Sequence, residues 1–483
     1  MSHATRRDFL RTALGASLGG LGLGRGALAR DGARGPHFAP RARRVVWMLH
    51  GGAPSHVDLF DRKPRLESDR GQELPAEVRG GQRLTTMTAG QAKFPLLPSL
   101  RPFRRYGECG LELSTLLPHT GSIADRICVV RSCYSEAINH APAMTLWLTG
   151  HQQPGRPSFG AWVAHALGSE NDSLPAFLVL TSRDRENSCG QLLYDHYWGS
   201  GFLSSALQGV KLHGQGDPVP YLSNPPGISA AQRAELVSDL RALNEAHLHE
   251  LHDPEIEART RQAELALRMQ ETVPELQDLS TEPEHVLALY GPDVRRRGSY
   301  AQNCLLARRL LERGARCVQL LHAGWDQHRN LPTQLEIQCR DTDQPSAALV
   351  LDLKQRGLLE DTLVVWGGEF GRTPFCQGDP NAKEHGRDHH GNAFSIWLAG
   401  AGIRGGTSFG ASDEWGYNVV DRSGHILRPT KDDPHPDAVH VHDVQATMLH
   451  TLGLDHERLT ARFQGRDFRL TDVHGQVVRP LLS

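Results

Sequence analysis

The chain has 483 residues, of which 39% are hydrophobic and 22% charged, and its formal net charge is -2. This length and composition suffice for a large buried core, and the near-neutral charge gives no argument for a partner that is nucleic acid or an anionic membrane surface. The eight cysteines include no C-x-x-C pair, so neither a cysteine-bound structural zinc nor a redox dithiol is indicated.

The first 29 residues are typical of a twin-arginine export signal. Arg6 and Arg7 precede a short apolar run, rich in glycine and alanine, that ends in an A-x-A cleavage pattern at residues 27–29. The run is too short and too rich in glycine for a stable membrane span, and no other segment approaches one. The alternative is a disordered basic tail. We expect residues 1–29 to direct export by the twin-arginine machinery, which carries folded proteins, to the periplasm or the extracellular space.

From Arg41 onward, short apolar runs alternate with helical stretches. Each run is continuously apolar, which is typical of strands in a sheet that is covered on both faces. The predicted strands are Val45–Leu49, Arg126–Ser132, Ala176–Ser182, Cys317–Gly324, Asp361–Gly371 and Phe394–Gly402. A helix is predicted over Pro345–Glu360. For residues 41–483 the alternation predicts an α/β fold, a three-layer α/β/α sandwich around a mostly parallel central sheet.

A charged helical stretch lies between the third and fourth predicted strands. Leu236, Leu240 and Leu243 fall on one face of it at helical spacing. We interpret this stretch, about residues 228–300, as a helical insertion or cap within the same domain.

Residue types that bind metal ions stand at the ends of several predicted strands. They are His50, His322, Asp326, Glu369, His389 and His390. In a parallel sheet the carboxyl ends of the strands share one edge, where ligands gather. Imidazoles and carboxylates together suit zinc, manganese or iron. We therefore expect one or two divalent metal ions at this edge, with zinc, manganese, iron and calcium all left open.

Two of these segments place their polar residues close together. In "GWDQH", Asp326 and His328 are two residues apart, so in an extended segment both face one ion. In "GGEFGR", glycines flank Glu369 and permit close approach of a ligand, and Arg372 suits a phosphate, sulfate or carboxylate. The alternatives are a polar surface loop for the first segment and a structural salt bridge for the second.

Two further segments offer additional ligands. His389 and His390 are adjacent, so their side chains point apart in most backbones and one of them is expected to bind the ion. In "HGGAPSHVDLFD", after the first strand, His50 and Asp58 are the residues that we place near the metal. A polar loop without a site is the alternative for the segment that holds His389 and His390.

These segments together resemble the alkaline phosphatase and sulfatase superfamily, and most closely the family named domain of unknown function 1501. The resemblance covers nearly all of the chain from Arg41. "DTLVVWGGEFG" is similar to the sulfatase strand that ends T-L-V-x-F-T-S-D-N-G, which implies a metal ligand at Glu369. "HHGNAFSIWLAGAG" resembles the phosphatase segment with a metal-binding histidine, matched by His389 or, with a shift of one residue, His390. "VQLLHAGWDQHRN" resembles the phosphatase strand that carries acidic and histidine ligands.

The chain also departs from the sulfatase pattern in two places. The first strand ends in H-G-G at residue 50, where sulfatases carry metal-binding aspartates. The nucleophile segment, C/S-x-P-S-R-x-x-L-L-T-G, is matched by "HAPAMTLWLTG" through Pro142 and Thr149. This match puts His140 at the position of the nucleophile, with no cysteine to mature into formylglycine. Sulfate-ester hydrolysis by that route is therefore not expected.

The resemblance leaves two functions open. The first is an exported metal-dependent hydrolase of phosphate or related esters, sulfate esters included, that acts on a small molecule or glycan. In this enzyme His140 is the nucleophile or a general acid–base, Arg372 is a second catalytic residue, and Thr145 is a weaker nucleophile. The second is an inactive relative that binds an anionic carbohydrate. The number of ligand-type residues favours the hydrolase.

Overall fold

The structure, a computed structural model, describes residues 35–483 apart from 83, 185, 187–191, 215–223 and 225. The predicted export signal at residues 1–29 lies outside the described residues. Among the helices of the described ranges, none has the length and apolar character needed to cross a membrane.

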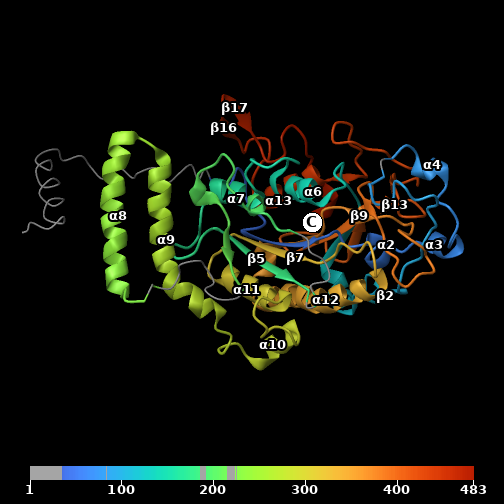
Figure 1. The fold of residues 1–483 in the computed structure, drawn as a ribbon, viewed down its shortest axis with the longest axis horizontal. Helices are drawn as coiled ribbons and strands as arrows, with labels where there is room; N and C mark the ends of the chain where they lie inside the picture. The colour runs from blue at the N-terminus through green and yellow to red at the C-terminus, as the bar shows by residue number, and fades with distance from the viewer. Residues whose placement is uncertain (1–34, 83, 185, 187–191, 215–223, 225) are drawn as a thin grey trace, which may run out of the picture. The chain divides into compact units, whose positions relative to one another are not determined.

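The centre of the fold is a nine-stranded sheet (Figure 1). Its strands are β1 (Arg44–Gly51), β4 (Ile127–Tyr134), β5 (Phe177–Arg183), β6 (Val210–Leu212), β7 (Cys317–Ala323), β8 (Thr362–Gly367), β11 (Phe394–Ala399), β12 (Thr407–Phe409) and β15 (Val439–His440). The order is β12-β4-β11-β8-β1-β7-β5-β6, with β15 beside β4. β11 is antiparallel to β4 and β8, whereas the other pairs are parallel.

All six predicted strands are present, and the mostly parallel sheet confirms the predicted fold class. β1 is buried over nearly its whole length, as the continuous apolar run indicated. β8 and β11 end earlier than predicted, at Gly367 and Ala399, because glycine-rich turns follow them.

Helices cover both faces of the sheet (Figure 1). On one face are α6 (His140–Thr149), α7 (Phe159–Leu167) and α13 (Val441–Thr451); on the other are α11 (Tyr300–Glu312) and α12 (Leu331–Gln355). Side chains of β1 alternate between these layers. Trp47 and Leu49 pack with the α6 side, whereas Val46 and Met48 pack with the α12 side. The sheet therefore separates two hydrophobic cores.

The helix predicted to begin at Pro345 is longer than expected. α12 begins at Leu331, so Pro345 lies inside it rather than in its first turn. Proline is common in the first turn of a helix because it lacks a backbone N–H, and for this reason the start of the helix was predicted at Pro345. Here the packing of a buried face against α11 compensates for the one lost hydrogen bond.

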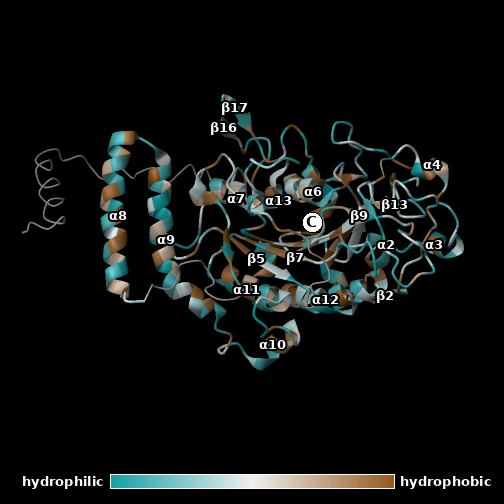
Figure 2. Ribbon diagram, in the orientation of Figure 1, coloured by the Kyte–Doolittle hydropathy of each residue, from teal (hydrophilic) through white to brown (hydrophobic). Residues whose placement is uncertain are grey.

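Three helices occupy the range predicted for the insertion: α8 (Ala230–Leu251), α9 (Pro254–Gln277) and α10 (Glu284–Tyr290). α8 begins with a capping box formed by Ser229 and Gln232. It packs along α9 and has no buried residue among those described, and its apolar positions, brown on the ribbon in Figure 2, include exposed leucines. α9 joins the core through Met269, Val273 and Leu276.

Short elements complete the domain. They are α2 (His56–Leu59), α3 (Pro64–Ser68), α4 (Ala76–Arg79), α5 (Pro118–Ser122), β2 (Phe103–Tyr106), β3 (Leu111–Ser114), β9 (Gly371–Arg372), β10 (His389–His390), β13 (Ala411–Ser412), β14 (Val419–Val420), β16 (Ala461–Phe463) and β17 (Arg466–Phe468). The 3-10 turn η2 (Asp195–Tyr197) packs on α6. β9 and β10 pair with each other at the edge of the sheet where β1, β7 and β8 end.

Candidate metal centre

Four side chains converge where the parallel strands end. They are His140, Asp326, His328 and His389, and one potential ligand atom of each lies within 4.8 Å of the others. His140 is the first residue of α6, Asp326 and His328 follow β7, and His389 belongs to β10. Their side chains are 8–19% exposed. The cluster is thus enclosed on most sides but still open to solvent.

One oxygen of Asp326 is the meeting point of this cluster. Oδ1 lies 3.0 Å from Nε2 of His328, 3.1 Å from Nε2 of His140 and 3.3 Å from Nε2 of His389. The Nε2 atoms of His328 and His389 are 2.9 Å apart. Ligand atoms around a tetrahedral zinc ion, with bonds of about 2.0–2.1 Å, are separated by roughly 3.3 Å. The spacing of the four atoms therefore suits a single ion among them.

The other nitrogen of each imidazole faces an oxygen acceptor. His140 Nδ1 lies 2.5 Å from Glu369 Oε1, His328 Nδ1 lies 2.6 Å from Gln377 Oε1, and His389 Nδ1 lies 2.7 Å from the carbonyl oxygen of Ile138. An imidazole that donates from Nδ1 presents an unprotonated Nε2. Three nitrogen lone pairs and a carboxylate oxygen would then face one another, an arrangement that a cation stabilises. The residues present therefore fit a divalent metal ion.

Glu369 stands behind His140 rather than within the cluster. Its side chain is fully buried, and Oε1 accepts a hydrogen bond from the backbone N–H of Gly52 at 2.9 Å as well as from His140. The indole of Trp147 donates to its carbonyl oxygen at 3.0 Å. The geometry gives Glu369 the place of the carboxylate that orients a metal-binding imidazole. Phe370 follows it and packs against the rings of His140 and His389.

Arg372 holds Asp326 in place. Its NH2 donates to Asp326 Oδ1 at 2.7 Å, and other donors reach the backbone oxygens of Ala53, Arg387 and Gly52. With these partners the guanidinium has little left to offer an incoming anion. Burial alone would raise the pKa of Asp326, but Arg372 and the three imidazoles keep that pKa well below its ordinary range.

The imidazoles of the cluster differ in their affinity for protons. Burial lowers the pKa of His140, but hydrogen bonds to Asp326 and Glu369 outweigh burial and raise it above the ordinary value. Burial also lowers the pKa of His389, and the nearby Arg372 adds to this effect although Asp326 opposes it, so its pKa falls to about 4. His389 is therefore neutral at neutral pH, as a metal ligand must be.

His50 lies outside the cluster. Its side chain is on the α12 side of the sheet, where Nδ1 accepts a hydrogen bond from the indole of Trp325 at 3.1 Å and the ring packs on Trp366. His322, its partner in the register of β1 and β7, lies beside it with ring centroids 5.9 Å apart. Burial lowers the pKa of both, to about 4 for His322. These two histidines belong to the core rather than to the metal centre.

Asp58 and His390 also face away from the cluster. Asp58 forms a fully buried ion pair with Arg387, with Oδ2 2.7 Å from Nε. His390 donates from Nε2 to the backbone oxygen of Tyr417 and stacks on its ring at 4.1 Å. The adjacent histidines of β10 thus point apart, and His389 is the one of the pair that enters the cluster.

The two residues considered as nucleophiles have different surroundings. His140 directs Nδ1 to Glu369, whereas its Nε2 lies 3.1 Å from Asp326 Oδ1 inside the cluster and has no hydrogen-bond partner. The hydroxyl of Thr145 donates to the carbonyl oxygen of Ala141 at 2.6 Å, in the preceding turn of α6, and lies 3.1 Å from His196.

The sequence model of the family described as protein of unknown function (DUF1501) matches residues 42–482. The chain belongs to this family. Similar solved structures include the PsFucS1 sulfatase from Pseudoalteromonas sp., with 12% identity, a TM-score of 0.35, and coverage of 92% of this chain and 72% of that one. The alkaline phosphatase from the Antarctic bacterium TAB5 has 11% identity and a TM-score of 0.29, and the match covers 75% of this chain and 92% of the phosphatase chain. The phosphonate monoester hydrolase SpPMH from Silicibacter pomeroyi has 12% identity, a TM-score of 0.33, and coverage of 76% and 71%. The search of curated proteins found no match.

Several groups that orient the side chains of the candidate metal centre in this DUF1501 protein could not be predicted from the sequence. Gln377 orients His328, and the carbonyl oxygen of Ile138 orients His389. A lone glutamine in a loop and a backbone oxygen belong to no motif. The indole that braces Glu369, from Trp147, was hidden within an apolar helix. These contacts depend on which loops the fold brings together.

Proposed function

We propose that this DUF1501 protein is an exported metal-dependent hydrolase of phosphate or related esters. The observation that carries the proposal is the convergence of three imidazole Nε2 atoms on one carboxylate oxygen. A metal ion bound there would polarise an ester oxygen and acidify a water molecule. Three imidazoles and one carboxylate favour zinc, manganese or iron over calcium, which prefers oxygen ligands.

The side chains around the centre position the ligands. Arg372 fixes Oδ1 of Asp326, and Glu369 keeps the proton of His140 on Nδ1 so that Nε2 faces the cluster. His140, which stands at the nucleophile's position in the sulfatase pattern, takes the role of a ligand in this proposal. Water then replaces the side-chain nucleophile, in line with the absence of the formylglycine cysteine.

Partial exposure supports a catalytic rather than a structural ion. Four protein ligands alone would complete the tetrahedral shell of a structural zinc ion, so catalysis at this cluster requires a further position for water or substrate on its exposed side. Asp326 is 19% exposed and His328 is 14% exposed. Solvent therefore reaches this side of the cluster, and the proposal has the substrate approach the ion from there.

The proposal is tested with two adjacent histidines as a matched pair. Purified wild-type protein is expected to hold about one zinc, manganese or iron ion per chain, the number the four-ligand cluster accommodates. It should hydrolyse an aryl phosphate mono- or diester, lose the activity to a chelator and regain it with metal. His389→Ala should lose both ion and turnover, whereas His390→Gln, whose residue lies outside the cluster, should keep both.

Three results would contradict the proposal. If the wild-type protein held no metal, the proposed metal site would be wrong. If His389→Ala kept its activity, the cluster would have no role in the reaction. If the protein held metal but hydrolysed neither phosphate esters nor aryl sulfates, it would be a binding protein rather than a hydrolase. Export is tested separately: replacement of Arg6 and Arg7 by lysine should retain the protein in the cytoplasm, as measured by cell fractionation.

A further inference from the structure

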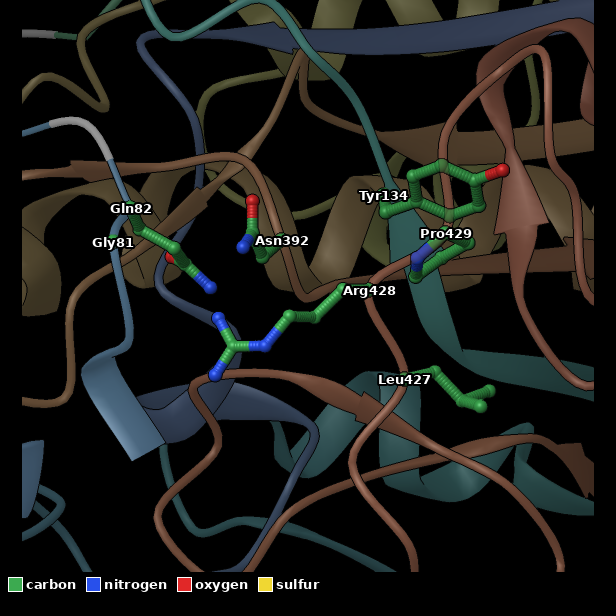
Figure 3. A pocket seen from close by; sticks show the side chains of 7 residues that line it. All are labelled: Gly81, Gln82, Tyr134, Asn392, Leu427, Arg428 and Pro429. Carbon is green, nitrogen blue, oxygen red and sulfur yellow. The ribbon is translucent and has the colours of Figure 1, made fainter. Parts of the chain in front are cut away.

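Two stretches of chain leave the central sheet side by side. β15 pairs in parallel with the end of β4, and in this register His440 lies opposite Tyr134. The ring of Tyr134 packs on that of His440, with centroids 5.0 Å apart, and Figure 3 shows this tyrosine at the pocket that it lines together with Pro429. β4 continues into residues 135–139, which lead to α6, whereas β15 continues into α13. The start of α13 is therefore fixed next to the segment that precedes α6.

Residues 135–139 contribute to the candidate metal centre although none of them is among its four potential ligands. The carbonyl oxygen of Ile138 accepts a hydrogen bond from Nδ1 of His389 at 2.7 Å. Asn139 is the N-cap of α6, whose first residue is His140, but its side chain makes no capping hydrogen bond and so does not hold the start of the helix. A shift of this segment would therefore move one imidazole of the cluster and release the partner of another.

Glu136 connects this segment to α13. Its Oε2 accepts a hydrogen bond from Nε2 of His440 at 2.7 Å, and its Oε1 accepts one from Nε2 of Gln152 at 3.2 Å. The backbone N–H of His442 donates to Nδ1 of His440 at 3.2 Å, so the ring proton is on Nε2 and faces the carboxylate. Burial alone would raise the pKa of Glu136, but the hydrogen bond from His440 outweighs burial and lowers that pKa to about 2. The contact between the two side chains is therefore charge-assisted at neutral pH.

α13 also holds the C-terminal end of α6. Nε2 of His442 donates to the carbonyl oxygen of Gly150 at 3.0 Å, and the amide of Gln445 donates to that of Trp147 at 2.8 Å. The last carbonyl oxygens of a helix lack donors within the helix, and here α13 supplies donors from outside. α6 is thus fixed to α13 at its C-terminal end directly, and before its N-terminal end through Glu136.

We propose that the contact between Glu136 and His440 positions two groups of the metal centre. They are the imidazole of His140 and the carbonyl oxygen of Ile138. Neither side chain of the contact belongs to the cluster, and both act through residues 135–139. This inference rests on the proposed function, because the two groups serve the proposed metal site. Loss of the contact frees the segment, so the cluster no longer holds a single geometry around an ion.

The first test compares the zinc affinity of full-length variants by competition with a chromogenic chelator. Glu136→Ala and His440→Asn should each weaken zinc binding about ten-fold, the lower end of the usual loss for a group that orients a ligand. Asparagine is a favourable N-cap, so His440→Asn keeps an acceptor at the start of α13 while its side chain is too short to reach Glu136. Glu136→Gln retains an acceptor and should restore most of the affinity. The control, His425→Ala, removes an exposed contact with Asp421 and should bind zinc as wild type does.

A second measurement needs neither metal nor turnover. In the metal-free proteins, hydrogen exchange at the backbone amides of residues 135–143 should be about ten-fold faster in Glu136→Ala than in wild type. Glu136→Gln and His425→Ala should exchange at close to the wild-type rate. Should His440→Asn fail to fold because it leaves a cavity in place of a buried ring, Glu136→Ala decides, since the Glu136 side chain is 35% exposed.

Wild-type zinc affinity in both Glu136→Ala and His440→Asn, or unchanged exchange in metal-free Glu136→Ala, would overturn the inference. If the wild-type protein binds no metal, the proposed function is wrong, and the exchange rates alone decide whether the contact positions the segment. If zinc binds and its affinity depends on neither residue, the proposed metal site stands and the positioning role is wrong.

Discussion

At the scale of single residues, the orientation of His140 depends on the carboxylate behind it. Oε1 of Glu369 lies 2.5 Å from Nδ1 and is itself held by the N–H of Gly52. A neutral acceptor binds the imidazole N–H less strongly than a carboxylate does. The charge of Glu369 therefore controls how firmly Nε2 is directed at the metal centre.

Replacement of Glu369 by glutamine tests this arrangement. We expect the affinity for zinc to fall about 10- to 100-fold, the usual cost of losing the partner of a metal-binding imidazole. Competition with a chromogenic chelator measures the affinity. The thermal midpoint of the metal-free variant serves as the control for folding. An unchanged zinc affinity would exclude the orienting role.

His322 gives the fold a dependence on pH. Its Nδ1 lies 3.0 Å from Ser182 Oγ and its Nε2 2.9 Å from Gln338 Oε1, and burial lowers its pKa from 6.5 to about 4. The unfolded chain therefore binds more protons than the folded one between these values, so stability is complete above pH 6.5 and falls as the pH drops toward 4. The loss from this residue is about 3 kcal/mol.

Urea denaturation at pH 7.5 and pH 4.5 measures this loss. A His322→Gln variant, which cannot titrate, should show a smaller difference between the two pH values than wild type does. The same difference in both proteins would mean that burial does not lower the pKa of His322 in the folded state.

At the scale of elements, the apolar runs were sufficient to predict the strands but not the direction of the polar residues at their ends. His50 was expected near the metal because it follows an apolar run. In β1 it shares a face with Val46 and Met48, on the α12 side. Both faces of the strand are apolar, so the sequence gives no sign of which face meets which helix layer. This ambiguity does not affect Asp326 and His328, because they lie in a loop after the strand and not in the strand itself.

The ion pair of Asp58 and Arg387 connects α2 to the chain just before β10. Both side chains are fully buried. Asp58→Ala leaves a buried arginine unpaired and should reduce the free energy of unfolding by about 3–5 kcal/mol. Replacing both residues, by Leu at 58 and Met at 387, should recover much of that loss because no charge remains buried.

Urea denaturation of the variants checks this expectation. The exposed pair of Arg462 and Asp467 provides the comparison, and Asp467→Ala should cost at most about 1 kcal/mol. A similar cost for the two aspartates would show that water reaches Asp58 in solution.

At the scale of the whole molecule, the centre is assembled from segments that are far apart in the chain. The four side chains that could hold a metal ion come from residue 140, residues 326 and 328, and residue 389. The resemblance to known families pointed to each segment separately. The resemblance could not tell whether Glu369 binds a metal ion or only hydrogen-bonds to His140, because that depends on how the loops pack. It also could not show that Asp58 lies outside the cluster, because that depends on its ion pair with Arg387.

Stability is unevenly distributed across the molecule. Leu243 on α8 is 48% exposed, whereas Leu276 on α9 is 1% exposed and belongs to the main core. Leu276→Ala should lower the free energy of unfolding by about 2–5 kcal/mol, while Leu243→Ala should change it by no more than about 0.5 kcal/mol. Urea denaturation of the two variants makes the comparison. A large loss from Leu243→Ala would show that α8 is covered in solution.

The dispersed origin of the ligands affects when a metal is acquired. The unfolded chain holds no preformed cluster, so an ion at the proposed site would bind only after residues 140 and 389 have been brought together, and its binding would then stabilise the folded state by mass action. With export in the folded state, as we propose, that event takes place before translocation. The metal supply of the cytoplasm, rather than that of the compartment where the protein works, would then determine which ion it carries.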